Sequence, residues 1–143
     1  MFERTDIIGR DSRAVHMTGF AFTSNHCFMK APAADRQPYA VAGLAWDGAT
    51  SNRPGARFGP RSIRESSHML CDGWHPLFDV TPLGSLGDAG DLPLPNTSLP
   101  ALREALAALV PPLIARHHMV WLGGDHSVTS VSYTHLTLPT NRE

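Results

Sequence analysis

Cysteines are scarce in this sequence, which limits both its compartment and its means of stabilisation. Only Cys27 and Cys71 occur among 143 residues, and neither lies in a Cys-x-x-Cys pattern. Small secreted domains that depend on disulfides are much richer in cysteine. We therefore expect no disulfide framework, a reducing compartment and a cytoplasmic protein.

Long apolar runs and a charge excess of either sign are also missing. The first residues, Met-Phe-Glu-Arg-Thr-Asp, lack the apolar core of a signal peptide, and no stretch is long enough to span a bilayer. Lys and Arg number 12 against 13 Asp and Glu, for a net charge of -1. Without a basic patch, we expect neither nucleic acid nor a membrane as partner.

The sequence does contain an alternation of apolar runs and amphipathic segments. Runs typical of buried strands lie at residues 39–46, 82–88 and 119–122, with helical spacing between them at 61–70 and 98–113. This alternation predicts an α/β fold, a parallel sheet with helices on its faces and right-handed crossovers. Three strands are too few for a finished domain, so we expect only the first part of a larger one.

Both predicted helices carry local details that can be checked. In the first, Ile63, Ser67 and Leu70 share one face. In the second, Ser98 is a suitable N-cap and leucines follow at helical spacing. Pro111-Pro112 should kink or break that helix.

The run ending in Gly123-Gly124-Asp125-His126-Ser127 is the strongest candidate site. A buried strand that stops at Gly-Gly delivers the next side chains to the carboxyl edge of a sheet, where ligands bind in open α/β folds. A neutral imidazole there suits a divalent first-row metal, so His126 is a candidate metal ligand. The alternative is a turn with local hydrogen bonds.

Two further segments follow the first two predicted strands. The loop 50–60 is rich in glycine and proline, and Arg53, Arg57 and Arg61 recur across it, so we expect some to pair with carboxylates of the fold or of a neighbour. Asp88-Ala-Gly-Asp91 could bind a cation, but such loops more often hydrogen-bond their own backbone, which we favour.

We expect Asp47, Asp88 and His126 to share the carboxyl edge of one sheet, with the Arg53–Arg57 loop on the same side.

Three segments together resemble the ureohydrolases, the arginase and agmatinase family, in its agmatinase-like branch. Residues 122–129, Leu-Gly-Gly-Asp-His-Ser-Val-Thr, are similar to the family's first metal-binding signature. The loop 50–60 is similar to the Arg-Pro-Gly loop of that branch, and residues 88–91 to its Asp-x-Gly-Asp. The resemblance covers roughly residues 38–129.

The resemblance implies a three-layer α/β/α fold, two Mn²⁺ ions and hydrolysis of a guanidinium compound to urea and an amine. His126 carries over as one metal ligand, and Asp125 and Ser127 only as neighbours that could orient it. Agmatine is the leading substrate, with guanidinobutyrate or a related guanidino acid as the alternative, and the complete protein is expected to be a homo-oligomer. A non-catalytic binding module that keeps the fold is the competing hypothesis.

The departures from the family pattern concern the metal ligands and the end of the chain. The family's two other Asp-rich signatures are absent, so no catalytic residue is identified and the fragment itself is expected to be inactive. Residues 131–143 resemble a translated sequencing adapter, although a genuine β-prone segment is the alternative. We therefore divide the chain into an N-terminal arm (1–37), a partial ureohydrolase domain (38–130) and an artefactual tail (131–143).

Overall fold

The computed structural model describes residues 26–70 and 73–129. In these residues three parallel strands form one sheet in the order β2-β1-β3. The strands are β1 (Tyr39–Leu44), β2 (Leu86–Asp91) and β3 (His118–Gly123). The tail 131–143 lies outside the described residues, and its origin stays a prediction.

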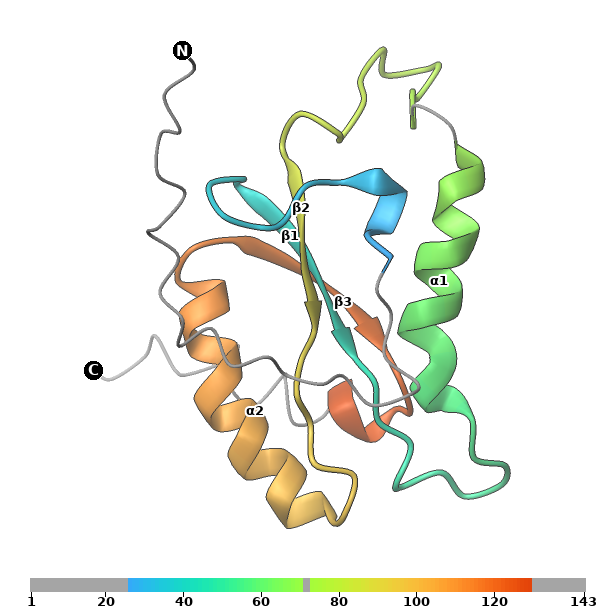
Figure 1. Ribbon diagram of the computed structural model, residues 1–143, viewed down its shortest axis with the longest axis vertical. Coiled ribbons are helices and arrows are strands. Elements are labelled where there is room, and N and C mark those ends of the chain that lie inside the picture. The colour runs from blue at the N-terminus through green and yellow to red at the C-terminus, as the bar shows by residue number, and fades with distance from the viewer. Residues whose placement is uncertain (1–25, 71–72, 130–143) are drawn as a thin grey trace, which may run out of the picture.

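Helices α1 (Gly59–Ser67) and α2 (Leu99–Ile114) connect the strands. The chain runs from β1 to β2 and then back across β1 to β3. Because parallel crossovers are almost always right-handed, this reversal puts the helices on opposite faces. Figure 1 shows α1 and α2 on the two sides of the sheet. The predicted α/β class with a parallel sheet between helices is confirmed.

Short 3-10 turns complete the described elements, at η1 (Phe28–Lys30), η2 (Ala56–Phe58) and η3 (His68–Leu70). No helix in the described parts of the chain is both long enough and apolar enough to cross a membrane.

The predicted apolar face of α2 packs on the sheet. Ser98 caps the helix as expected, because its side chain accepts a hydrogen bond from the Ala101 N–H at 3.3 Å. Leu102, Leu106 and Val110 are fully buried against Leu44 and Trp46 of the β1 segment, among others. Each such side chain contributes about 1.5–3 kcal/mol of hydrophobic stabilisation.

Of the kink or break that was predicted at Pro111-Pro112, the break does not occur. Both prolines lie inside α2, which continues to Ile114. A proline removes the N–H that would bond the carbonyl four residues earlier, so the carbonyls of Ala107 and Ala108 lose their helical donors. Ala107 and Ala108 are exposed, so water can hydrate those carbonyls, and the helix ends within a turn.

Of the three residues expected to share one face of the first helix, only Ser67 is buried. Ile63 and Leu70 are 40% and 56% exposed, whereas Pro60 and Arg64 are fully buried. The sheet under α1 carries the carboxylates of β2, and a guanidinium complements carboxylates better than an alkyl side chain does.

The second strand begins later than predicted, because residues 82–85 form a turn. The N–H groups of Ser85 and Leu86 both donate to the carbonyl of Pro82, at 2.9 Å. Beyond that turn, the end of the N-terminal arm pairs with the outer edge of β2. The Asp88 N–H donates to the carbonyl of Pro32 at 2.8 Å, and the Ala34 N–H donates to the carbonyl of Asp88 at 3.0 Å. Residues 32–34 at the end of the N-terminal arm therefore pack on β2 of the same chain.

Gly43, in the middle strand, allows α1 to approach the sheet closely. A β-carbon at this position would collide with the carboxylate of Asp91 and lie 3.0 Å from Cβ of Pro60. Pro60 is in the first turn of α1. A larger residue would therefore push α1 and β2 apart.

We predict that Gly43→Ala lowers the free energy of unfolding by about 1–3 kcal/mol, the usual range for overpacking a core. Gly84→Ala is the matched control, because a β-carbon there meets nothing within 4 Å. The control should be neutral or slightly stabilising. Urea denaturation followed by tryptophan fluorescence measures both, and equal losses would contradict the steric explanation.

Candidate functional site

The loops that follow β1 and β3 lie side by side at the carboxyl edge of the sheet. Beyond the strands, the Gly124 N–H donates to the Leu44 carbonyl at 3.0 Å and the Asp125 N–H to the Trp46 carbonyl at 2.8 Å. A β-carbon on Gly124 would collide with the backbone of Trp46. The Gly-Gly pair thus lets two loops meet where the sheet ends.

His126 lies at this edge, as predicted. Its side chain is exposed, and its imidazole has no hydrogen-bond partner among the described residues. Within the same residues, no three His, Cys, Asp or Glu side chains come close enough together to hold a metal ion. His126 can therefore offer one ligand, but the described residues do not form a complete metal centre, and its metal role stays a prediction.

The carboxylate of Asp125 joins the two loops. Its Oδ2 accepts a hydrogen bond at 2.9 Å from the N–H of Ala49, which belongs to the loop after β1. Its Oδ1 accepts from the Ser127 N–H at 2.9 Å and from the Ser127 hydroxyl. Asp125 thus lies beside His126 and holds the start of the helical segment at 127–129.

Asp47 organises the arginine-rich loop from within. Its carboxylate is buried, and Oδ2 accepts hydrogen bonds from the Gly55 N–H at 2.7 Å and from Arg57 Nε at 2.9 Å. Its Oδ1 accepts no hydrogen bond but lies 2.7 Å from Arg57 Nη2 in an ion pair. Burial alone would raise the pKa of Asp47, but the hydrogen bonds from Arg57 and Gly55 outweigh it and lower this pKa.

The prediction that some loop arginines pair with the fold's own carboxylates is confirmed. Arg57 pairs with buried Asp47, and Arg61 pairs with exposed Glu65 at 2.8 Å. The loop lies at the same edge as His126, as expected, because it follows directly from β1.

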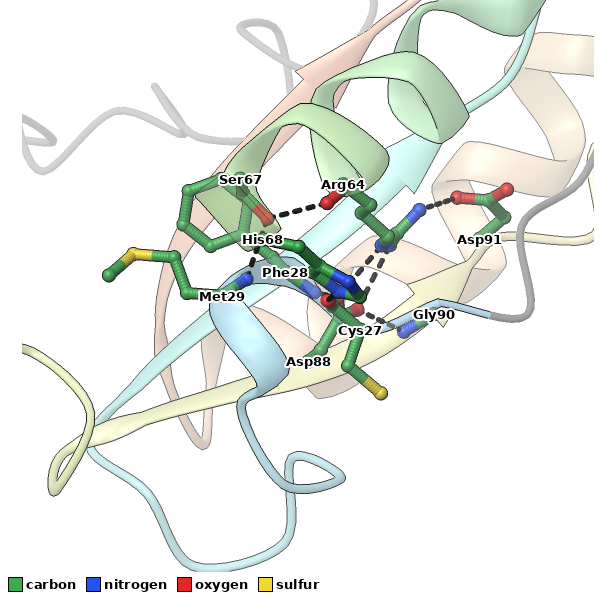
Figure 2. Close-up of polar contacts among 9 residues, drawn as sticks. All are labelled: Cys27, Phe28, Met29, Arg64, Ser67, His68, Asp88, Gly90 and Asp91. Atoms are coloured by element: carbon green, nitrogen blue, oxygen red, sulfur yellow. Dashed lines mark hydrogen bonds and ion pairs between the residues drawn. The ribbon is translucent and has the colours of Figure 1, made fainter. Parts of the chain in front are cut away.

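Asp88 does not lie at the carboxyl edge, which corrects the predicted placement. It is the third residue of β2 and lies opposite Val41, inside the sheet. Figure 2 shows its carboxylate facing the guanidinium of Arg64, with contacts of 2.8 Å (Nε to Oδ2) and 2.9 Å (Nη2 to Oδ1). Arg64 Nη1 donates to Asp91. Asp88 Oδ1 also accepts a hydrogen bond from the Gly90 N–H at 2.8 Å, which is the local backbone contact that was favoured. The pairing of both carboxylates with Arg64 was not predicted.

The same network holds the N-terminal arm against α1. The Phe28 N–H donates to Asp88 Oδ2 at 2.7 Å, and the Met29 N–H donates to the Ser67 hydroxyl at 2.7 Å. Burial alone would lower the pKa of Arg64, but the hydrogen bonds to Asp88 and Asp91 raise it. Sequence reasoning missed Arg64, although Pro60, Arg64 and Ser67 follow a helical stripe that could have indicated a buried charge.

We predict that Arg64→Ala lowers the free energy of unfolding by about 3–5 kcal/mol, because it leaves two buried carboxylates without their cation. Arg61→Ala, in the same helix, removes only an ion pair between exposed side chains and should cost much less. Denaturant titration of both variants tests this, and similar losses would argue against the buried network.

We also predict a pH-dependent effect of Asp47→Asn. Because the pKa of Asp47 is lowered on folding from its ordinary 3.8, its charge stabilises the fold above that pH. This contribution is lost as the pH falls through the lowered value. At pH 7 the variant should be less stable by about 1–3 kcal/mol, and the difference should shrink below pH 4 or so. Urea titrations across this range, with exposed Asp35→Asn as control, measure it.

Comparison with known sequences places these features in one family. Residues 37–138 match the profile of the arginase family. The chain is 36% identical over 94 residues to an agmatinase of Pyrococcus horikoshii, covering 64% of this chain and 33% of that protein. It is 41% identical over 96 residues to a mitochondrial guanidino acid hydrolase of Homo sapiens, covering 63% and 26%.

A solved structure has the same fold. The chain superposes on the proclavaminate amidino hydrolase of Streptomyces clavuligerus with a TM-score of 0.69 and 30% sequence identity, over 81% of this chain and 40% of that one. The chain spans about a third of the length of the first curated relatives that it matches. Since the family profile covers most of the sequence and the parallel α/β fold agrees, this chain belongs to the arginase family.

Proposed function

We propose that the complete protein containing this chain hydrolyses the guanidinium group of a small molecule to urea and an amine. Membership in the arginase family supports this proposal. The observation that carries it is His126, an exposed imidazole at the carboxyl edge of the sheet with no competing partner among the described residues. Such an edge is where ligands bind in open α/β folds.

Agmatine is the leading substrate in this proposal, and a guanidino acid is the alternative. The two classes share the guanidinium group and differ at the far end, which is an ammonium in agmatine and a carboxylate in guanidinobutyrate. A guanidino acid is supported as the alternative substrate by a relative with 41% identity that is named a guanidino acid hydrolase.

We further propose Mn²⁺ as the cofactor, with His126 as one ligand and the remaining ligands outside the described residues. Imidazole and carboxylate are suitable donors for Mn²⁺. When bound, a pair of such ions supplies a nucleophile at neutral pH and neutralises developing charge. The residues of this chain contribute the position of His126 and the two loops around it. A non-catalytic protein that keeps the fold without metals is the competing proposal.

A homo-oligomeric, cytoplasmic complete protein is part of the same proposal. Met69, Leu77 and Phe78 are each more than two thirds exposed, at 84%, 85% and 71%. Leu77 and Phe78 are neighbours in the chain, and exposed apolar side chains that adjoin are typical of surfaces that other parts of an assembly cover. The low cysteine content supports a reducing compartment.

We predict that the complete enzyme releases urea from agmatine after reconstitution with Mn²⁺ and not after removal of the metal by chelation. His126→Ala should lower both retained Mn²⁺ and kcat. The decrease in kcat should exceed the roughly tenfold to hundredfold loss typical of residues that only support a ligand. Urea release and metal content per subunit are the measurements, with 4-guanidinobutyrate run in parallel to decide the substrate class.

His118→Ala is the matched control, because His118 is an exposed histidine at the start of β3, the strand that leads to His126. It should change neither metal content nor kcat. Residues 1–143 alone should release no urea, because His126 by itself cannot bind two ions. Urea release by that fragment, or unchanged metal content in His126→Ala, would refute the assignment of His126.

A further inference from the structure

Asp125 is the side chain best placed to control where His126 points. The parallel ladder between the two loops ends where the Asp125 N–H bonds the Trp46 carbonyl. Past that point, the carboxylate of Asp125 reaches back to the Ala49 N–H, 76 residues away in the sequence. The link therefore joins two segments that meet only in the folded protein.

The carboxylate of Asp125 receives three hydrogen bonds on its two oxygens. One comes from Ala49, and two come from the N–H and hydroxyl of Ser127. Hydrogen bonds to an ionised acceptor are roughly twice as strong as neutral ones. His126 lies between Asp125 and Ser127, so both of its neighbours in the chain are held.

This arrangement matters because no side chain or backbone group within residues 26–70 and 73–129 hydrogen-bonds the imidazole of His126. A histidine that binds a metal almost always donates its second ring N–H to a nearby acceptor, which fixes the ring. No such acceptor is present among the described residues. In the part of the chain that the structure describes, His126 is thus oriented through its backbone, and Asp125 holds that backbone through the Ser127 N–H.

A second carboxylate holds the far part of the opposite loop. Asp47 accepts from the Gly55 N–H and pairs with Arg57, whereas Asp125 accepts from Ala49. The segment between Ala49 and Gly55 is thus fixed at each end by a different carboxylate. The two attachments can be removed one at a time.

We propose that Asp125 is a positioning residue that sets the orientation of His126 relative to the Ala49–Gly55 loop. It acts through backbone and hydroxyl groups and binds neither substrate nor metal. The proposal rests on the proposed function, in which His126 is a metal ligand. Misplacing a reacting group by about 1 Å can cost on the order of 100-fold in rate, so the attachment is expected to affect turnover.

The test compares Asp125→Ala and Asp125→Asn with the wild-type complete enzyme. Asparagine keeps an oxygen for Ser127 but places its amide nitrogen toward the Ala49 N–H, so it should lose only the link between the loops. We expect faster amide hydrogen exchange at Ala49 in both variants, measured without metal. We expect kcat and retained Mn²⁺ to fall about tenfold to hundredfold in Asp125→Ala and less in Asp125→Asn, with a smaller effect on KM.

Two control variants separate positioning from a general loss of structure. Asp47→Asn should speed exchange near Gly55 and leave Ala49 protected. His126→Ala should lower retained Mn²⁺ and leave exchange at Ala49 unchanged. Should Asp125→Ala fail to fold, Asp125→Asn provides the same readouts.

The proposal is overturned if Ala49 exchanges at the wild-type rate in both Asp125 variants. It is also overturned if these variants lose thermal stability but keep wild-type kcat and Mn²⁺ retention. Failure of the proposed function has a different signature, namely no urea from any guanidino compound tested. In that case the exchange and Mn²⁺-retention measurements still decide the role of Asp125, because neither requires a substrate.

Discussion

The buried guanidinium of Arg64 is the group on which the arrangement of this chain depends most. It connects α1 to β2 through Asp88 and Asp91, and Asp88 in turn holds the N-terminal arm at Phe28. A buried ion pair adds little net stability, because desolvation offsets most of the attraction, but an unpaired buried charge is very costly. We interpret the network as a constraint that permits one depth and one register of α1 on the sheet.

That constraint extends from the helix to the candidate site. With α1 held against the sheet, its first residue, Gly59, lies so close to the carbonyl of Gly123 that a β-carbon would be 2.7 Å from the oxygen. The end of β3 and the start of α1 are therefore in direct contact. The arginine-rich loop spans the distance from β1 to this contact, and Asp47 holds its middle through Gly55. The packing of α1 on the sheet and the arrangement of the loops at the carboxyl edge therefore depend on each other.

Local patterns account for the features that could be predicted. The parallel α/β class, the Ser98 cap and the position of His126 each depend on residues adjacent in the sequence. The failed predictions applied a local rule where context decides. Pro111-Pro112 lie near the end of α2, where the carbonyls that lose their donors belong to exposed residues. Ile63 has the right spacing for a buried face, but it lies about 100° around α1 from Arg64, which is the residue that the helix buries.

The sequence by itself determined that an imidazole follows a glycine-terminated strand in an arginase-family motif, because that pattern is contiguous. Only the tertiary structure decided how the surrounding carboxylates are used. Arg64 engages Asp88 and Asp91 from 24 and 27 residues away, and Asp125 binds the Ala49 N–H across 76 residues. A carboxylate in a sequence has the same chemistry whether it will bind a cation, a backbone N–H or a metal. Its partner is chosen by which groups the fold brings within about 3 Å, and no local pattern encodes that choice.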